Sequence, residues 1–230
     1  VDFLRREAQG CGAAFTFESG LPDGSVVTRR KGGGIVQLQV RGIASHAGTA
    51  PEQGASAVLE AARKIVAIQA LSDPAHTTFN CGIIHGGTSA NVVPDRCEVS
   101  VALRFHTNRD RDEALSALQS ICGRVETPGT QCTLSPLAGF PAMEETDRTA
   151  ALFALYRDTS TALGLGTPES VYSAGCSDSA FTTSMGIPTL CAVGVLGEGQ
   201  HSPHEHALEG SLLTQAKRLT AAILSMPDDF

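Results

Sequence analysis

The sequence lacks tryptophan, has few aromatic residues (5% of 230 positions) and contains no long run of basic residues. Its most concentrated positive charge is the short segment Arg29-Arg30-Lys31, in a chain whose formal net charge is −7. Nucleic acids are bound by basic surfaces and by aromatic side chains that stack on bases. These absences argue against a nucleic-acid partner, and the acidic balance argues against a membrane-surface partner.

A C-x-x-C pair and a long apolar run are missing too. The seven cysteines are scattered along the chain: Cys11, Cys81, Cys97, Cys122, Cys132, Cys176 and Cys191. An odd, unpatterned set predicts reduced, mostly buried thiols in a reducing compartment, hence a cytoplasmic protein, and neither a disulfide framework nor a zinc knuckle. No membrane span is expected. The chain begins at Val1 in a helix-like segment without an initiator Met or a signal peptide. We therefore expect missing upstream sequence, which leaves export open.

The hydrophobic pattern predicts an insertion between two flanking segments. Residues 34–138 alternate between strand and helix periods in the order βαββαβ, which is typical of a two-layer, ferredoxin-like α+β sandwich. Residues 1–33 and 139–230 read as α/β material. Because glycine accepts almost any backbone angle, Gly32-Gly33-Gly34 predicts a hinge, and residues 137–141 predict the return hinge.

Individual elements follow from the same periods. In the insertion we expect strands at Val36–Val40, Thr77–Ile84, Cys97–Phe105 and Gln131–Leu137, a helix around Val58–Ile65, and a second helix that opens at a capping box of Asp110 and Glu113. In the flanks we expect strands at Ala13–Phe17 and Ser25–Arg30, helices at Leu152–Tyr156 and Ser177–Met185, and a last helix with Leu212, Ala216, Leu219 and Ile223 on its apolar face. The apolar run Pro188–Leu196 predicts a strand inside a parallel sheet.

The segment Gly199–His206 is the densest group of metal-binding residue types. It has three imidazoles and a carboxylate just after the apolar run, and Pro203 would stiffen the loop. Imidazole and carboxylate groups suit zinc. The alternative interpretation is a cluster of solvated surface histidines.

Three residues of the insertion are candidates for a functional role. His46 lies in the loop Gly42–Gly48, and Asn91 follows a glycine pair and offers both a donor and an acceptor. Arg104 is a strong cation on the polar face of its strand and suits a bidentate carboxylate contact. The alternatives are a loop histidine, a plain β-turn and an exposed strand charge.

Together these segments resemble one family, the co-catalytic zinc exopeptidases and amide hydrolases that include glutamate carboxypeptidase, acetylornithine deacetylase and succinyl-diaminopimelate desuccinylase. The matching pieces occur in family order: Phe15-Thr16-Phe17-Glu18, Arg30-Lys31-Gly32, Gly42–Gly48, Asn91-Val92-Val93-Pro94, Leu103-Arg104, Gly175-Cys176-Ser177-Asp178, and His201-Ser202-Pro203 with Glu205.

The resemblance implies a zinc-exopeptidase-like α/β catalytic domain, split in sequence by a dimerising lid. By position, Glu18 and His201 each match a ligand of one of two zinc ions. His46 matches a lid histidine that reaches across a homodimer to stabilise the oxyanion in the partner's active site. Asn91 and Arg104 match lid residues that hold the substrate and its carboxylate.

The family's His-x-Asp motif, bridging aspartate and Glu-Glu pair are not in this sequence. Glu144-Glu145 follows the insertion and reads as a solvated hinge face, and His204 and His206 stay unassigned. We expect a zinc-dependent hydrolase that cleaves small peptides or acyl-amino acids with a free carboxylate, resembles glutamate carboxypeptidase, and is inactive as this chain alone. Two alternatives stay open: an N-acyl amino acid deacylase of the same family, and a truncated, non-catalytic chain that dimerises or binds a ligand.

Overall fold

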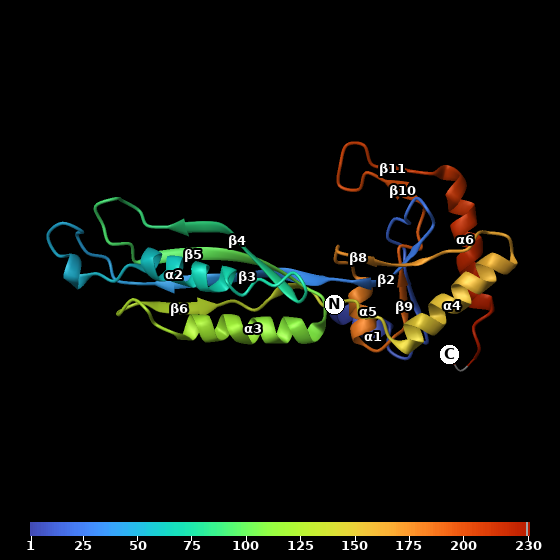
Figure 1. The fold of residues 1–230 in the computed structure, drawn as a ribbon, viewed down its shortest axis with the longest axis horizontal. Helices are drawn as coiled ribbons and strands as arrows, with labels where there is room; N and C mark the ends of the chain where they lie inside the picture. The colour runs from blue at the N-terminus through green and yellow to red at the C-terminus, as the bar shows by residue number, and fades with distance from the viewer. Residues whose placement is uncertain (229) are drawn as a thin grey trace. The chain divides into compact units, whose positions relative to one another are not determined.

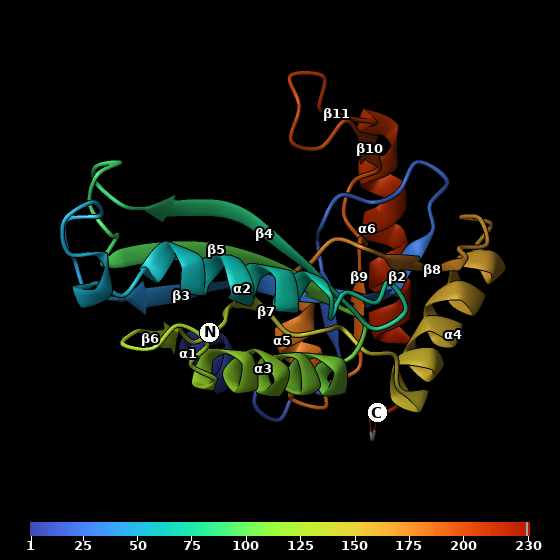
Figure 2. The ribbon, with the colours of Figure 1, turned by 60° about the vertical axis from the view of Figure 1, so that its left-hand side comes forward.

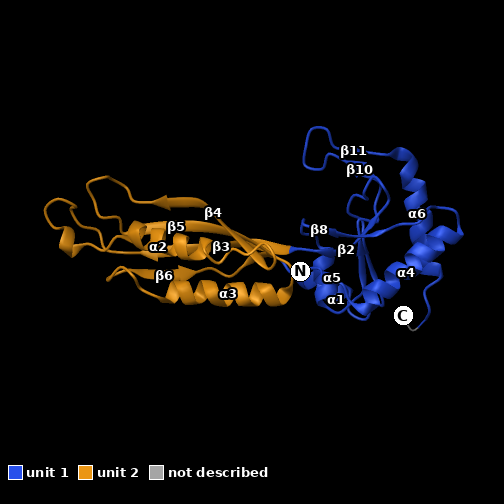
Figure 3. Cartoon of the chain, in the orientation of Figure 1, with its two compact units in different colours: residues 1–31, 140–230 blue, residues 32–139 orange. Residues whose placement is uncertain are grey.

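The computed structural model describes residues 1–228 and 230 and divides into two compact units. Unit 1 combines Val1–Lys31 with Phe140–Phe230, and unit 2 is the continuous segment Gly32–Gly139 (Figure 3). Compared with the expected 34–138, unit 2 begins two residues earlier and ends one residue later. Among the described residues, no helix is both long enough and apolar enough to cross a membrane.

Unit 2 is an antiparallel sheet with two long helices packed against it (Figures 1 and 2). Its strands lie in the order β4-β5-β3-β6. The bounds are β3 (Gly32–Arg41), η1 (Pro51–Gln53), α2 (Ala57–Gln69), β4 (Thr77–Gly86), β5 (Arg96–Phe105), α3 (Asn108–Gly123) and β6 (Gln131–Leu134). Alternate residues of β3 and β5, such as Leu38 and Val101, are fully buried, as the period of two predicts.

The N-terminus of α3 differs from the sequence interpretation. The capping box is formed by Thr107 and Asp110, and Glu113 instead pairs with Arg109. Thr107 has extended backbone angles (φ −129°, ψ 161°), so its hydroxyl can accept from the Asp110 N–H while the Asp110 carboxylate accepts from the Thr107 N–H. The predicted box of Asp110 and Glu113 was therefore wrong by one helical turn.

Both segments expected to be hinges are paired strands. Gly32–Gly34 begins β3 and lies opposite residues 103–105 of β5, while β7 (Ala138–Phe140) pairs with β3. A Cβ on Gly34 would lie 2.4 Å from the carbonyl oxygen of Ala138, and one on Gly139 would lie 2.1 Å from that of Gly33. Glycine is needed at positions 34 and 139 because the two backbones approach too closely for a Cβ atom. Conformational freedom is not the reason for glycine at these positions.

Unit 1 contains a short mixed sheet in the order β1-β9-β2-β8. The strands are β1 (Ala14–Thr16), β2 (Val26–Arg30), β8 (Ser170–Ser173) and β9 (Thr189–Cys191), and the helices are α1 (Asp2–Glu7), α4 (Asp147–Ala162), α5 (Ser179–Ser184) and α6 (Glu209–Leu224). β1 and β9 are parallel, but β9 and β2 are antiparallel. The predicted long strand from 188 to 196 is thus shorter, because Ala192 adopts φ +61° and ends it, and its sheet is not purely parallel.

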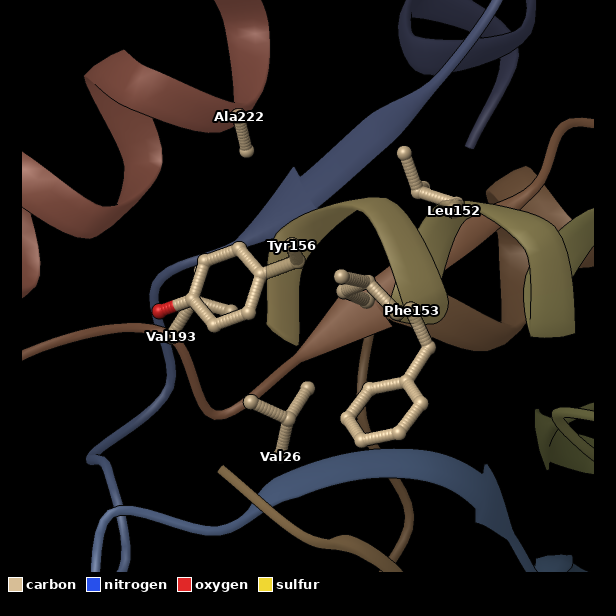
Figure 4. Packing of buried hydrophobic residues seen from close by; sticks show 7 residues of the cluster. Val26, Leu152, Phe153, Tyr156, Val193 and Ala222 are labelled. Atoms are coloured by element: carbon tan, nitrogen blue, oxygen red, sulfur yellow. The ribbon is translucent and has the colours of Figure 1, made fainter. Parts of the chain in front are cut away.

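The core of unit 1 lies between this sheet and the adjacent helices α4 and α6 (Figure 4). Buried members come from strands, from helices and from the segment after β9: Val26, Leu152, Phe153, Tyr156, Leu190, Val193 and Ala222.

Helix α6 buries a different face from the one predicted. Leu212 is 64% exposed and Ile223 is 49% exposed, whereas Gln215 and Arg218 are buried. The guanidinium of Arg218 donates to the Leu165 carbonyl and to Gln215, which in turn donates to Gly194, so these buried polar groups are satisfied. The polar network decides which face of α6 turns inward.

Candidate functional site

The loops that carry His46 and Asn91 meet at one end of the unit 2 sheet (Figures 1 and 2). The first loop follows β3, and the second joins β4 to β5. Ala47 donates its backbone N–H to the carbonyl of Asn91, and Val93 donates to that of Ser45, each at 2.9 Å. The two loops therefore form one small backbone-paired surface.

The imidazole of His46 is exposed and oriented by its own loop. Its Nδ1 accepts the backbone N–H groups of Gly48 and Thr49 at 3.1 and 3.2 Å. Because Nδ1 is an acceptor, the neutral ring carries its proton on Nε2. His46 consequently presents an Nε2–H donor.

The amide of Asn91 is oriented in a similar way. The hydroxyl of Ser89 donates to Asn91 Oδ1 at 2.6 Å, and Gly87 takes a left-handed turn at φ +73° just before it. With Oδ1 occupied, the amide NH₂ group is the part left to donate to a ligand.

Gly54 packs against both loops at a point where no side chain would fit. A Cβ at this position would lie 2.4 Å from Ser45 Oγ and 2.9 Å from the Cβ of Val93. Sequence reading placed Gly54 only in a glycine- and proline-rich loop, and its packing role came from the tertiary structure.

Arg104 lies toward the opposite end of the same sheet. In the β3–β5 register, Arg104 pairs with Gly33 near the start of β3. Arg96 lies eight residues earlier on β5 and pairs with Arg41, the last residue of β3 before the His46 loop. Eight residues of strand span roughly 27 Å. One copy of unit 2 therefore does not bring Arg104 to the same ligand as His46 and Asn91.

The guanidinium of Arg104 has little to hold it. Its Nη1 donates to the carbonyl of Leu103 at 3.3 Å, and no carboxylate among residues 1–228 and 230 lies within ion-pair distance. An exposed arginine without an internal counter-ion is suited to bind an external carboxylate.

Glu18 and His201 both follow strands of unit 1. Glu18 comes two residues after β1, where its carbonyl accepts from Gly194 at 3.1 Å. His201 lies at the tip of the hairpin formed by β10 (Gly197–Glu198) and β11 (His206–Ala207), with φ +63°. Its backbone N–H donates to Glu205 Oε2 at 3.3 Å.

Glu18 and His201 offer the carboxylate and imidazole groups that zinc prefers, but two ligands are too few for a zinc site. In the part of the chain that the structure describes, no three His, Cys, Asp or Glu side chains are grouped so that they could hold an ion. His204 and His206 do not complete a set in this part of the chain. The Nδ1 of His206 contacts the backbone carbonyl of His204 at 3.1 Å. The residues present therefore form at most part of a metal centre.

Sequence reading missed the structural role of Arg30. Its side chain is 9% exposed, and it donates to Cys191 Sγ at 3.3 Å, to Ser173 Oγ at 3.0 Å and to the Gly175 carbonyl at 3.1 Å. It thereby anchors the start of the segment Gly175–Asp178. The alternation of strand residues could have indicated this role, because Arg30 lies on the same buried face of β2 as Thr28 and Val26.

Residues 28–130 match the sequence profile of the peptidase dimerisation domain. Carboxypeptidase G2 of Pseudomonas sp. is 25% identical over 229 residues, which cover 97% of this chain and 54% of that protein. Acetylornithine deacetylase of Myxococcus xanthus is 32% identical over 107 residues, 41% of this chain and 28% of that protein. The chain thus spans about half the length of carboxypeptidase G2.

Solved structures share the fold. Aminopeptidase PepT from Bacillus cereus superposes with a TM-score of 0.74 at 24% identity, covering 95% of this chain and 58% of that one. A tripeptidase from Staphylococcus aureus gives a TM-score of 0.74 at 22% identity, covering 96% of this chain and 58% of that one.

Proposed function

We propose that the whole protein hydrolyses an amide or peptide bond in a substrate with a free carboxylate. The chain is a homologue of carboxypeptidase G2 and acetylornithine deacetylase and carries a peptidase dimerisation domain. The similarity to carboxypeptidase G2 along 97% of the chain carries the proposal. The names of the relatives favour small peptides and N-acyl amino acids as the two substrate classes.

In this proposal Arg104 recognises the substrate carboxylate. Its guanidinium has no carboxylate partner among the described residues, and its planar donor pair suits a bidentate contact. A neutral substrate end would leave that cation unpaired, so the contact would also select against amides and esters at this position.

His46 would act on the developing oxyanion. Its Nδ1 already accepts two backbone N–H groups, so the Nε2–H is oriented for donation. A fixed donor aimed at developing charge is a large contributor to acyl-transfer catalysis. Asn91, joined to the same surface through its backbone, would add a substrate contact.

The separation of Arg104 from His46 supports a homodimer. Arg104 lies roughly 27 Å along β5 from the strand end that leads to the His46 loop, so the two groups can share a substrate only if they come from different copies. We propose that unit 2 is a ferredoxin-like lid, as its βαββαβ order and its strand order suggest. Its His46 end would complete the active site of the partner.

Zinc is the metal we propose for the whole protein, with two ions. Glu18 and His201 would each hold one of them, and the remaining ligands would come from residues that this sequence does not contain. Bound zinc polarises a carbonyl oxygen and activates water.

Hydrolysis assays on the whole protein test the proposal. Dipeptides that end in glutamate should be cleaved, and N-acetyl amino acids should be poor substrates; the reverse preference would establish the N-acyl deacylase alternative. Removing metal with a chelator should abolish the rate, and added zinc should restore it. No rate above buffer with either class would favour the non-catalytic dimerising chain.

Substituting Arg104 tests the substrate contact. Arg104→Ala should raise KM at least tenfold for carboxylate-bearing substrates, since a charge-assisted contact contributes about 1.5–3 kcal/mol. Arg96→Ala, on the same strand at its other end, is the matched control and should leave KM near the wild-type value. Equal effects of the two substitutions would contradict the assignment.

A further inference from the structure

Two of the free cysteines lie side by side in unit 2. Cys122 is in the last turn of α3, and Cys132 lies in β6 opposite Val40 of β3. The Cys132 thiol donates to the sulfur of Cys122 with the two Sγ atoms 3.2 Å apart. A disulfide bond is about 2.05 Å long, so bonding requires the sulfur atoms to approach by only about 1.2 Å.

A buried ion pair lies close to this thiol pair. Lys64 and Glu60 on α2 form a contact of 2.9 Å and are almost completely inaccessible to solvent. The hydrogen bond from Cys132 lowers the pKa of the Cys122 thiol; burial opposes this, and the charge of Lys64 lowers it further. The same hydrogen bond raises the pKa of Cys132. Of the two thiols, Cys122 therefore loses its proton more readily, and Cys132 is the hydrogen-bond donor.

The backbone between the two cysteines is held independently of their sulfur atoms. The Glu60 carboxylate accepts the N–H groups of Glu126 and Thr127, the latter at 2.7 Å, and the ammonium of Lys64 donates to the Arg124 carbonyl. These contacts hold the Cys122 end of the loop, and the pairing of β6 with β3 holds the Cys132 end.

We propose that Cys122 and Cys132 form a modification site at which a hydroperoxide produces an intramolecular disulfide. The Cys122 thiolate attacks one oxygen of hydrogen peroxide, the O–O bond breaks, and hydroxide leaves as a sulfenic acid forms. The Cys132 thiol then attacks the sulfenic sulfur, and its proton leaves with the hydroxyl group as water. In total, two thiols and one peroxide become one disulfide and two waters, and a dithiol reductant reverses the reaction.

The disulfide would tie the end of α3 to β6, which pairs with β3. A short covalent loop restricts the unfolded chain more than the folded one, so the oxidised form should melt at a higher temperature. This site is independent of the hydrolase proposal, because neither cysteine belongs to the surface formed by the His46 and Asn91 loops.

Peptide mapping of the whole protein tests the site. The protein is treated with hydrogen peroxide under native conditions, its remaining thiols are alkylated in denaturant, and it is digested with trypsin. Cleavage after Arg111, Arg124 and Arg148 separates peptide 112–124, which contains Cys122, from peptide 125–148, which contains Cys132. We expect a peroxide-dependent cross-link between these peptides, lighter by two hydrogen atoms than their sum, that dithiothreitol removes.

Matched variants assign the bond. Cys122→Ser and Cys132→Ser should each abolish the cross-link, while Cys97→Ser, a buried cysteine of β5 in the same unit, should retain it. Recovery of both wild-type peptides alkylated or over-oxidised to sulfinic acid, or a cross-link from either peptide to another cysteine, overturns the proposal. The wild-type map decides the question even if a serine variant fails to fold.

Discussion

His46 is held as an oriented hydrogen-bond donor, which is the geometry that the proposed catalytic role requires. Two backbone N–H groups occupy its Nδ1, so neither rotation nor tautomer exchange is needed to present Nε2–H to an oxyanion. We expect His46→Ala in the full-length enzyme to lower turnover by about two to three orders of magnitude, the usual result of deleting one oxyanion donor. Steady-state kinetics should show the loss mainly in kcat, with KM little changed, because the contact forms in the transition state.

His85→Ala is the control for that experiment. His85 is an exposed histidine of β4 in the same unit and lies outside the two paired loops. Its removal should leave kcat within a factor of about two of wild type, as for most surface substitutions. Turnover of His46→Ala close to wild type would remove His46 from the mechanism.

At the scale of an element, strand β3 depends on close backbone contacts at its start. Gly34→Ala would place a methyl group 2.4 Å from the carbonyl oxygen of Ala138, which is backbone and cannot move aside easily. We expect a loss of about 1–3 kcal/mol in the free energy of unfolding, as for overpacking elsewhere. Urea denaturation of the two proteins measures it.

Gly123→Ala is the matched substitution. A Cβ on Gly123, at the end of α3, meets no atom within 4 Å. The change should be neutral or stabilise by up to about 1 kcal/mol. If Gly34→Ala were as well tolerated as Gly123→Ala, the strand pairing described for β3 and β7 would be incorrect.

The cap of α3 makes the stability of unit 2 depend on pH. Burial alone would raise the pKa of Asp110, but hydrogen bonds from Thr107 and His76 outweigh it, so the folded-state pKa lies below the ordinary value. A carboxyl group with a depressed folded pKa stabilises the protein above its unfolded pKa, about 3.9, and this stabilisation disappears as the pH falls through the folded pKa.

We therefore expect Asp110→Asn to be less stable than wild type at pH 7 by about 0.5–2 kcal/mol, the range for a lost helix cap. The difference should shrink as the pH falls below the unfolded pKa, about 3.9, and through the lower folded-state pKa, where the Asp110 carboxyl of the folded protein takes up its proton. Urea denaturation at pH 7 and pH 3 measures both values. Asp112→Asn, at an exposed position of the same helix, should show no such pH-dependent difference; a constant difference for Asp110→Asn would refute the assignment.

For the whole molecule, the opposed positions of His46 and Arg104 predict complementation between subunits. An equal mixture of His46→Ala and Arg104→Ala chains, allowed to exchange subunits, forms about half heterodimers. Each heterodimer has one site with both residues intact, so activity should return to about a quarter of wild type. Activity assays before and after exchange detect this.

A second mixture serves as its control. His46→Ala mixed with Asn91→Ala should not recover, because the two loops belong to one surface of one copy and each site receives one defective surface. No recovery in the first mixture, or equal recovery in both, would refute the shared active site. A single-chain mass by light scattering would refute the homodimer.

Much of unit 2 could be predicted from the sequence, because its strands have one buried face. Alternation along residues 97–105 identifies β5 whatever its neighbours are. The α3 cap could not be located in this way, since Thr107 and Asp110 are both capping residues and each precedes a carboxylate by three positions. Only the extended backbone of Thr107 distinguishes them.

The sequence by itself determined the order of elements in unit 2, the residue types of the candidate site and the resemblance to amide hydrolases, because periodicity and short motifs are local properties. The tertiary structure alone decided three other matters. It turned the polar face of α6 inward, since Gln215 and Arg218 find hydrogen-bond partners far away in sequence. It placed His46 beside Asn91 and far from Arg104, and it brought Cys122 to Cys132, because strand register and backbone pairing arise only when distant segments pack together.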